Sequence, residues 1–245
     1  MRTFGLIGNP LTHSFSKKYF EEKFVQLGIA DARYELFELS SLEDYNQLIT
    51  DKISAGLNVT IPFKEKIIPF LDEVDDEANA IGAVNCIQFK KGKSKGYNTD
   101  VYGFEMSVKP FLENKYERAL ILGTGGASKA VAHVLKKWNI PFHFATRNPV
   151  KENHLDYGAL SAENIHFFPL IINTTPLGTF PDIDQCPEIP FSSLNANHFL
   201  IDLIYNPAES LFLQKGKKAG AQIMNGKRML ELQADKSWEI WNSVD

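Results

Sequence analysis

The 245-residue sequence has few cysteines and no long hydrophobic run. Cys86 and Cys186 lie far apart, without the close spacing of a zinc site or the dense pattern of a disulfide framework. No stretch approaches the ~20 apolar residues of a membrane span, and the first residues run directly into a strand pattern rather than a signal peptide. These absences predict a protein of the reducing cytoplasm without a membrane partner.

The sequence also lacks an excess of basic charge. It has 26 Lys and Arg residues against 30 Asp and Glu residues, which gives a formal net charge of −4. The basic residues are scattered, so the chain offers no positive field for a nucleic acid. The six histidines show neither the HxH nor the HxxxH spacing of metal ligands. We therefore expect no nucleic acid partner and no metal site.

With 44% hydrophobic residues, the chain can bury the core of one large domain or of two modest ones. Strand patterns alternate with amphipathic helical patterns, and this alternation predicts an α/β fold with parallel sheets. Strands are predicted at 3–8, 33–39, 56–61, 82–89, 119–122, 141–145, 170–173, 199–205 and 221–224. Helices are predicted from Ser16, Ser40, Pro62 and Asp72, from Asp100 as N-cap, at 127–138 and at 227–241.

A glycine-rich turn joins the apolar run 119–122 to the amphipathic stripe 127–138. Gly123 and Gly125 allow a tight turn and a close approach of the backbone to a phosphate, while the first N–H groups of the helix face an anion. The third fingerprint position holds Ser128 in place of Gly or Ala. The order strand, turn, helix favours a dinucleotide site over a loop that merely needs glycine.

The strand that follows ends in Thr146, Arg147 and Asn148, with no Asp or Glu before Glu152. An NAD site usually presents a carboxylate here to the ribose hydroxyls, whereas arginine suits a 2′-phosphate. The sequence therefore favours NADP as cofactor. A solvated arginine at the end of a strand is the alternative interpretation of Arg147.

Polar residues also gather after the predicted strand at 56–61. The period of two places Asn58 and Thr60 on one face, at the end where open α/β sheets bind ligands. Pro62 suits the first position of a helix, which places the Lys64 ammonium group in a first turn, where the helix dipole opposes its charge. This position favours a proton-transfer role for Lys64 over an ordinary solvated lysine.

Other candidate residues have structural alternatives that the sequence leaves open. Ser16 suits a helix N-cap, and Ser14 a loop hydroxyl. Asp100 is a natural N-cap, although a cap can also serve chemistry. The amides of Asn85 and Gln233 lie in otherwise apolar patterns and need partners, which could be a ligand or protein groups.

Seven ordered motifs through almost the whole chain resemble the shikimate dehydrogenase family. They are Gly-Asn-Pro-Leu-x-His-Ser-Phe-Ser, Asn-Val-Thr-Ile-Pro-Phe-Lys, Gly-Ala-Val-Asn, Gly-x-Asn-Thr-Asp-x-x-Gly, Gly-x-Gly-Gly-Ala, Asn-Thr-Thr-Pro-Leu-Gly and Met-Leu-x-x-Gln-Ala. The resemblance implies reversible reduction of 3-dehydroshikimate to shikimate with NADPH, within chorismate and aromatic amino-acid biosynthesis. Two positions depart from the family pattern: Lys17 stands in place of Pro, and Thr146-Arg147-Asn148 stands in place of Asn-Arg-Thr.

The same resemblance implies roles for individual residues. Lys64 and Asp100 are the expected catalytic pair, because a cationic donor held by a carboxylate can stabilise and protonate the alkoxide that hydride transfer leaves. The expected substrate residues are Ser14 and Ser16 at the carboxylate, Thr60, Asn85, Asp100 and Gln233 at the ring hydroxyls, Tyr205 near the substrate and Asn58 at the cleft wall. The expected cofactor residues are Gly123, Gly125, Gly126 and Ala127 at the pyrophosphate, Arg147 and Asn148 at the adenosine, and Thr174, Leu203 and Gly226 at the nicotinamide.

We thus predict two domains: a substrate-binding and catalytic α/β domain with a mixed or parallel sheet, at 1–100, and a Rossmann-like NADP-binding domain, at 101–226. The C-terminal helix, at 227–245, is expected to return to the first domain. The protein could be a monomer or a homodimer. Two alternatives stay open: a quinate/shikimate dehydrogenase-like paralogue that uses NAD, and a non-catalytic binding module for ligands of the shikimate pathway.

Overall fold

The computed structural model describes residues 1–12, 14–52, 55–112 and 116–243. The chain forms two compact units, one of Met1–Tyr102 with Glu231–Asp245 and the other of Gly103–Leu230. The boundaries between the units fall within helix α4 (Thr99–Val108) and within helix α7 (Lys227–Asn242). The last helix therefore contributes most of its length to the first unit.

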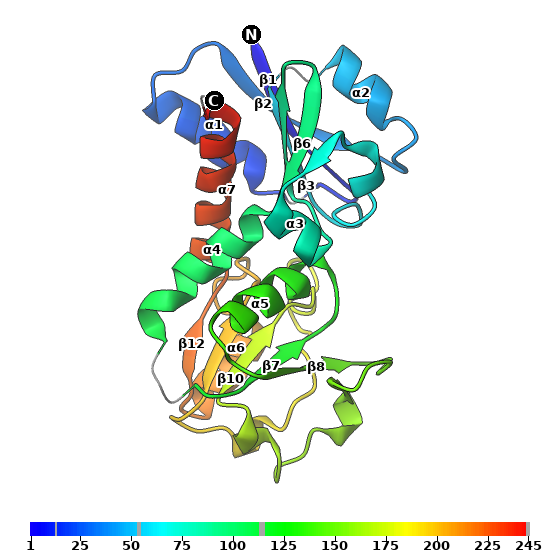
Figure 1. The fold of residues 1–245 in the computed structure, drawn as a ribbon. Helices are drawn as coiled ribbons and strands as arrows, with labels where there is room; N and C mark the ends of the chain where they lie inside the picture. The colour runs from blue at the N-terminus through cyan, green and yellow to red at the C-terminus, as the bar shows by residue number, and fades with distance from the viewer. Residues whose placement is uncertain (13, 53–54, 113–115, 244–245) are drawn as a thin grey trace. The chain divides into compact units, whose positions relative to one another are not determined.

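The first unit is built on a mixed six-stranded sheet in the order β2-β1-β3-β5-β6-β4 (Figure 1). Its strands are β1 (Arg2–Gly8), β2 (Ala32–Glu38), β3 (Gly56–Val59), β4 (Glu73–Val74), β5 (Cys86–Lys90) and β6 (Lys93–Tyr97). β1 pairs in parallel with β2 and β3, whereas β5 is antiparallel to β3 and β6. Lys91 and Gly92, both at positive φ, form the two-residue turn between β5 and β6.

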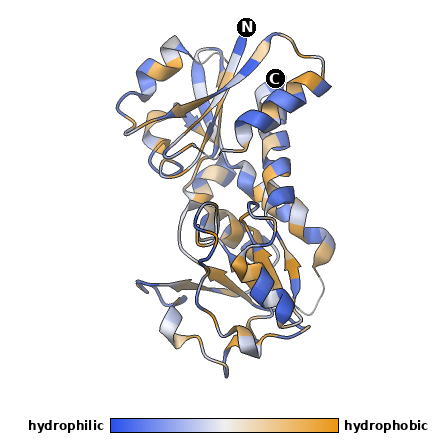
Figure 2. Cartoon of the chain, turned by 180° about the vertical axis from the view of Figure 1, so that it is seen from behind, coloured by the Kyte–Doolittle hydropathy of each residue, from blue (hydrophilic) through white to orange (hydrophobic). Residues whose placement is uncertain are grey.

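The helices of this unit cover a sheet whose strands carry the apolar residues. They are α1 (Ser16–Gln26), α2 (Tyr45–Asp51), the short 3₁₀ helix η1 (Ile68–Phe70), α3 (Asp76–Ile81) and most of α7. Figure 2 shows the same pattern as colour, with apolar residues gathered in strands and helices of mixed character. α2 begins at Tyr45, later than the predicted start at Ser40. Before it, Ser41 Oγ accepts a hydrogen bond from the N–H of Glu43 in a separate turn.

The helix predicted from Pro62 is wrong. Residues 61–67 form turns, and only η1 follows them. The main reason is the carbonyl group of Lys64, which accepts a hydrogen bond of 2.7 Å from the backbone N–H of Val84. A helix would need that carbonyl for Ile68, whose N–H instead bonds to the carbonyl of Glu65. The dipole argument for Lys64 therefore does not apply.

Two predicted helix caps are also displaced, by one residue in α1 and by two residues in α4. α1 begins at Ser16 itself, with Phe15 at the cap and with no side-chain bond there. α4 begins at Thr99, so Asp100 lies in its first turn, where a negative charge is favoured by the helix dipole. The side chain of Asn98 accepts from the N–H of Val101 and takes the capping place expected of Asp100.

An aromatic cluster binds α1 and α7 to the first sheet. The ring centroid of Trp241 lies 4.9 Å from that of Phe4 and 5.3 Å from that of Phe20, and Tyr34 stacks on Phe20 at 4.5 Å. Gly56 permits this packing, since a Cβ there would overlap the indole ring of Trp241. Each large side chain removed from water stabilises the fold by roughly 1.5–3 kcal/mol.

The second unit is a parallel six-stranded sheet in the order β12-β11-β10-β7-β8-β9. Its strands are β7 (Ala119–Leu122), β8 (Phe142–Thr146), β9 (His154–Asp156), β10 (Leu170–Asn173), β11 (Phe199–Asp202) and β12 (Gln222–Met224). Since β7 is the first of them in the chain, the order is that of the Rossmann fold, with its topological switch point between β7 and β10. The predicted α/β fold class is confirmed for both units.

The helices of the second unit include one that the sequence analysis did not predict. The unit contains the end of α4, the 3₁₀ helix η2 (Lys109–Phe111), α5 (Gly126–Lys137), the 3₁₀ helices η3 (Tyr157–Ala159), η4 (Ile165–Phe167) and η5 (Phe191–Ser193), and α6 (Leu211–Lys218). α6 is the missed helix. Between β8 and β10 the helices among the described residues are all 3₁₀ helices.

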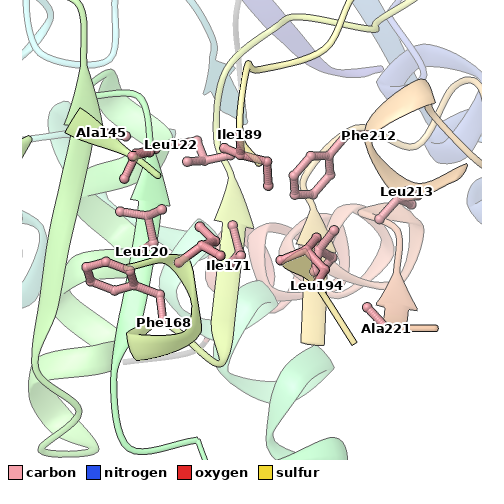
Figure 3. Packing of buried hydrophobic residues seen from close by; sticks show 13 residues of the cluster. Leu120, Leu122, Ala145, Phe168, Ile171, Ile189, Leu194, Phe212, Leu213 and Ala221 are labelled. Carbon is pink, nitrogen blue, oxygen red and sulfur yellow. The ribbon is translucent and has the colours of Figure 1, made fainter. Parts of the chain in front are cut away.

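Alternate residues of the parallel strands fill the core of the second unit. Leu120 and Leu122 of β7 and Ile171 of β10 project to one face, where Phe212 and Leu213 of α6 cover them (Figure 3). α5 packs against β7 as well, with Ala130, Val131, Val134 and Leu135 buried. The carboxyl ends of the strands thus remain for the loops that carry the predicted cofactor residues.

Candidate active site

Lys64 and Asp100 form an ion pair in the first unit. Lys64 Nζ lies 2.6 Å from Asp100 Oδ2, and the two side chains are only 15% and 9% exposed. Lys64 comes from the turns after β3, whereas Asp100 comes from the first turn of α4. The ammonium group carries three hydrogens, so the bond to Asp100 leaves others for a further acceptor.

Asn85 holds the second oxygen of the Asp100 carboxylate. Asn85 Nδ2 donates to Asp100 Oδ1 at 2.8 Å, and Asn85 Oδ1 accepts from the backbone N–H of Thr99 at 2.7 Å. The partner that the sequence analysis sought for the Asn85 amide is therefore at least partly the protein itself. The result is a carboxylate whose two oxygens are each fixed by one neighbour.

Asn58 is part of a buried network behind this pair. Asn58 is 5% exposed, and it donates to Asn85 O at 3.2 Å and to Ser237 Oγ at 2.9 Å. Its own oxygen accepts from the hydroxyl of Tyr34 at 2.9 Å. Both polar atoms of the Asn58 side chain are thus bonded to protein groups. Its expected place at the cleft wall stays a prediction.

The sequence analysis missed Tyr34, Thr99 and Ser237, which complete this network. Thr99 Oγ1 lies 3.2 Å from both Asn85 Oδ1 and Ser237 Oγ. Burial raises the pKa of Tyr34 well above its usual value, against a smaller opposing effect of a hydrogen bond with Ser16. A small hydroxyl such as that of Ser237, within a helix whose apolar stripe includes Trp238 and Trp241, gives no sequence signal of its own.

The two predicted carboxylate-binding serines stand next to one another at the start of α1. Ser14 Oγ accepts from the backbone N–H of Ser16 at 3.3 Å. Lys17, the residue that departs from the family pattern, pairs with Glu35 of β2 at 3.0 Å. His13 of the same motif lies outside the described residues.

The loops after β1 and β3 leave the sheet at the same edge, because the two strands are parallel. They lie so close that a Cβ on Gly8 would overlap the methyl group of Thr60. The segment that leads to Ser14 and Ser16 therefore begins beside Thr60. Four residues after Thr60 the chain reaches Lys64.

Gln233 is presented to this region by α7. Thr99 Oγ1 lies 3.5 Å from Gln233 Oε1, and Ser237 Oγ donates to the carbonyl of Gln233 at 2.9 Å. Gln233 is half-buried rather than enclosed. Hydrogen bonds thus link Lys64, Asp100 and Asn85, and through Thr99 also Gln233, within one unit.

The predicted pyrophosphate residues form the turn between β7 and α5. Gly123 has φ of +96°, and a Cβ on it would meet Thr175 Cγ2 at 2.9 Å. Gly125 caps α5, and a Cβ on Gly125 would enter open space. Gly126 and Ala127 are the first two residues of the helix, so their N–H groups have no partner within it. This arrangement fits a phosphate-bearing dinucleotide.

Ser128 fits the third position of the glycine fingerprint, where Gly or Ala is usual. Its side chain is buried, and its hydroxyl donates to the carbonyl of Gly125 at 2.6 Å. The hydroxyl is therefore satisfied inside the first turn of α5. A serine is small enough for the close approach of helix and strand that this position requires.

Thr174, Leu203 and Gly226 follow β10, β11 and β12 along the carboxyl edge of the second sheet. Thr174 Oγ1 donates to Leu122 O at 2.6 Å, beside the Gly123 turn. A Cβ on Gly226 would overlap the backbone of Leu203, so these two residues touch. Tyr205 also follows β11 at this carboxyl edge, and its side chain is half-buried in the second unit.

A buried carboxylate holds two of these loops. Asp202 Oδ1 accepts from Asn173 Nδ2 and from the N–H of Ile204, both at 3.0 Å, and Asp202 Oδ2 accepts from Ser210 Oγ. Burial raises the pKa of Asp202 to about 6, although its three hydrogen bonds act in the opposite direction. Asp202 was not predicted from the sequence. It fixes the loops that carry Thr174 and Leu203.

Arg147 and Asn148 follow β8 and are exposed. Within the part of the chain that the structure describes, Arg147 forms no hydrogen bond or ion pair. Asn148 N donates to Thr146 Oγ1 at 3.3 Å, which makes a turn at the end of the strand. Burial raises the pKa of Tyr157 to about 12, and the nearby charge of Arg147 partly opposes this rise.

Two classes of feature are not found among residues 1–12, 14–52, 55–112 and 116–243. No group of three or more His, Cys, Asp or Glu side chains is arranged to hold a metal ion. No helix in these ranges is long and apolar enough to cross a membrane. Cys86 and Cys186 are both free thiols, and burial raises the pKa of Cys86 to about 12.

Comparison with known proteins bears on the same regions. Residues 6–87 match the family model of the shikimate dehydrogenase substrate binding domain. Shikimate dehydrogenase (NADP(+)) of Methanococcus maripaludis strain C6 is 40% identical over 258 residues, which cover 97% of this chain and 90% of the relative. The chain belongs to the shikimate dehydrogenase family. The family resemblance inferred from the seven motifs is thereby confirmed.

Two further relatives agree with this membership. Shikimate dehydrogenase (NADP(+)) of Clostridium beijerinckii is 39% identical, and the match covers 98% of this chain and 92% of the relative. The crystal structure of shikimate 5-dehydrogenase from Thermus thermophilus, in complex with NADP(H) and shikimate, has a TM-score of 0.87 at 27% identity. That match covers 100% of this chain and 94% of the solved one. Family membership thus extends over both units.

Proposed function

We propose that this protein is an NADP-dependent shikimate dehydrogenase, which interconverts 3-dehydroshikimate and shikimate. The observation that carries the proposal is the Lys64–Asp100 pair, held by Asn85 beside Gln233 in the first unit. Membership of a family whose relatives carry this name supports the substrate and the cofactor.

The first unit supplies the acid–base chemistry. In the direction of reduction, the substrate carbonyl carbon receives a hydride and its oxygen becomes an alkoxide. Lys64 Nζ donates a proton to that oxygen and is left neutral, and solvent restores the proton. Asp100, ionised and hydrogen-bonded to Lys64, stabilises the ammonium form and directs it. In the direction of oxidation, neutral Lys64 accepts the proton from the hydroxyl group of shikimate.

The remaining polar residues of the first unit bind and orient the substrate. Ser14 and Ser16 bind its carboxylate through their hydroxyl groups. Thr60, Asn85 and Gln233 bind the ring hydroxyl groups. Such groups discriminate strongly, because a ligand that lacks a hydroxyl leaves them unpaired.

The second unit binds the cofactor. NADPH supplies the hydride when it is bound. Gly123, Gly125, Gly126 and Ala127 hold its pyrophosphate with backbone N–H groups, because the open turn and the start of α5 suit an anion. Arg147 and Asn148 take the adenosine end, where the free guanidinium group suits a 2′-phosphate. Thr174, Leu203 and Gly226 border the nicotinamide.

These roles define the two domains of the proposal: a substrate-binding and catalytic domain, close to the predicted 1–100 with 227–245, and a dinucleotide-binding domain, close to the predicted 101–226. We place the enzyme in the cytoplasm, since a buried free Cys86 and an unpaired Cys186 suit a reducing compartment. The protein could be a monomer or a homodimer. The residue roles given above are the same in both cases.

Initial rates test the proposal, followed at the absorbance band of reduced nicotinamide. Purified protein is given shikimate or quinate with NADP or NAD, in all four combinations. Turnover fastest with shikimate and NADP is expected. Dominance of quinate or NAD would move the protein to the paralogue class, and no turnover in any combination would favour a binding module.

A further inference from the structure

Ser237 is a hydroxyl group in an unusual place. It lies on α7 among Ala234, Trp238 and Trp241, and its side chain is 0% exposed. Its oxygen accepts from Asn58 Nδ2, and its hydrogen reaches the carbonyl of Gln233, one helical turn earlier. A serine used only as filler in an apolar stripe would bond to its own helix alone.

Two arms lead from Ser237 to Asn85. In the first arm, Asn58 Nδ2 bonds to both Ser237 Oγ and the backbone carbonyl of Asn85. In the second arm, Thr99 Oγ1 lies 3.2 Å from Ser237 Oγ and donates to it, because the Ser237 hydrogen goes to Gln233, and the backbone N–H of Thr99 bonds to Asn85 Oδ1. Asn85 is therefore held at its backbone and at its side chain by groups that converge on one hydroxyl.

The direction of each bond follows from the chemistry of the groups. The carbonyl of Asn85 can only accept, so the Asn58 amide nitrogen must face it and the Asn58 oxygen must face Tyr34. Likewise, the backbone N–H of Thr99 can only donate, so the Asn85 oxygen faces Thr99 and its NH₂ group faces Asp100. The network thus fixes which end of the Asn85 amide meets the carboxylate.

We propose that Ser237 and Asn58 are positioning residues, which set the orientation of Asn85 and through it the carboxylate of Asp100. Ser237 also ties the turn of α7 that presents Gln233 to the same network. The inference rests on the proposed function. It adds a buried hydrogen-bond network that fixes the position of the C-terminal helix relative to the catalytic pair. Neither residue needs to touch the substrate.

The primary test is the variant Ser237→Ala, which removes the hydroxyl without adding bulk. Loss of the hydroxyl leaves the Asn58 N–H and Thr99 without their shared partner, so we expect kcat for shikimate oxidation to fall about tenfold, the size of one lost buried hydrogen bond. KM for NADP is expected to stay unchanged, because its binding residues lie in the other unit. Unchanged kcat would overturn the proposal.

Ser107→Ala is the matched control. Ser107 is also a buried serine within a helix, and its hydroxyl donates to the carbonyl of Phe104 at 2.9 Å. Among the described residues, its hydroxyl bond stays within its own helix and does not join the Asn58 and Asn85 network. We expect this variant to keep the parental kcat, even where its melting temperature falls as much as that of Ser237→Ala. Equal losses of kcat in the two variants would show a general effect of destabilisation and would overturn the proposal.

A double-mutant cycle separates positioning from structural support. If Ser237 acts through Asn85, Ser237→Ala should cause no further loss of kcat in an Asn85→Ala background. Loss factors that multiply in the double variant would mean that Ser237 acts independently, which contradicts the inference.

A crystal structure of Ser237→Ala gives a readout that does not depend on turnover. We expect the Asn85 amide to rotate or the Asp100 carboxylate to leave its 2.8 Å contact. An unchanged Asn85 and Asp100 would overturn the positioning role. Should the parent protein fail to turn over shikimate, the proposed function fails by itself, and this structure still decides the positioning role.

Discussion

At the scale of single residues, the partners that the protein already provides separate two kinds of polar side chain. Asn58 has every polar atom bonded to protein groups, so it acts on its neighbours. Arg147 is exposed and has no ion pair among the described residues, so its five N–H donors are available to a ligand. The same distinction assigns Asp202 a structural task and Lys64 a chemical one.

Arg147→Ala tests the 2′-phosphate site. Charge-assisted hydrogen bonds are worth about 1.5–3 kcal/mol, so we expect KM for NADP to rise about tenfold or more and KM for NAD to change little. Steady-state kinetics with both cofactors measure the difference. Arg118→Ala is the matched control, because Arg118 is exposed but precedes β7, at the opposite edge of the same sheet. Equal rises in both KM values would remove Arg147 from the phosphate site.

Asp202 predicts a dependence of stability on pH. Its pKa is about 6 in the folded protein against a usual 3.8, so ionisation disfavours the folded state. The penalty is absent below about pH 4, grows as pH rises through 6, and reaches about 3 kcal/mol. Asp202→Asn can keep the bonds to Asn173 and Ile204 but has no carboxylate to ionise. Urea denaturation should therefore show this variant gaining stability relative to the parent between pH 4 and pH 7, and a constant difference would contradict the account.

Sequence reasoning found the residues whose types are rare at their positions. Lys64 was selected because a helix dipole was expected to oppose its charge, and Asp100 was selected through the family resemblance. Ser237, Thr99 and Tyr34 were missed, because a hydroxyl in an apolar pattern acquires its meaning only from partners that are distant in the sequence. Asp202 was missed for the same reason, since its partners belong to two other segments.

At the scale of elements, strong hydrophobic periodicity predicted the residue bounds of strands and helices well. Local capping rules predicted the starts of helices less well. β7 and β10 were placed at their observed residues, and α5 was placed within one residue at each end. The helix predicted from Pro62 failed because Val84, twenty residues away from Lys64, takes the carbonyl that the helix would need. Such competition for a backbone group is invisible in a local pattern.

The docking of α7 on the first sheet predicts coupling between Gly56 and Trp241. Gly56→Ala should destabilise the protein by about 1–3 kcal/mol, because the new Cβ overlaps the indole ring. Trp241→Phe by itself should also destabilise it, since the indole N–H bond to Ile87 O at 3.0 Å is lost. The double variant should lose less than the sum of the two, because the smaller ring makes room for the methyl group. Additive losses in urea denaturation would contradict this packing.

At the scale of the whole molecule, each unit carries a complete part of the proposed chemistry. The mixed sheet brings Lys64, Asp100 and Asn85 together from three segments, and the parallel sheet gathers its glycine turn and Thr174 at a switch point. The strand order of neither sheet was predicted from the sequence, whereas the α/β class and the order of motifs were. Family membership over nearly the full chain joins the two parts in one enzyme.

The central claim is that Lys64 moves the proton, and Lys64→Ala tests it most directly. The measurement pairs kcat for shikimate oxidation with the shikimate dissociation constant by calorimetry. We expect kcat to fall by at least 10²-fold, the usual contribution of a positioned acid or base, while shikimate binding weakens only slightly. A variant that keeps comparable kcat would contradict the proton-transfer role of Lys64, and a variant that loses binding while keeping kcat would make Lys64 a substrate ligand only.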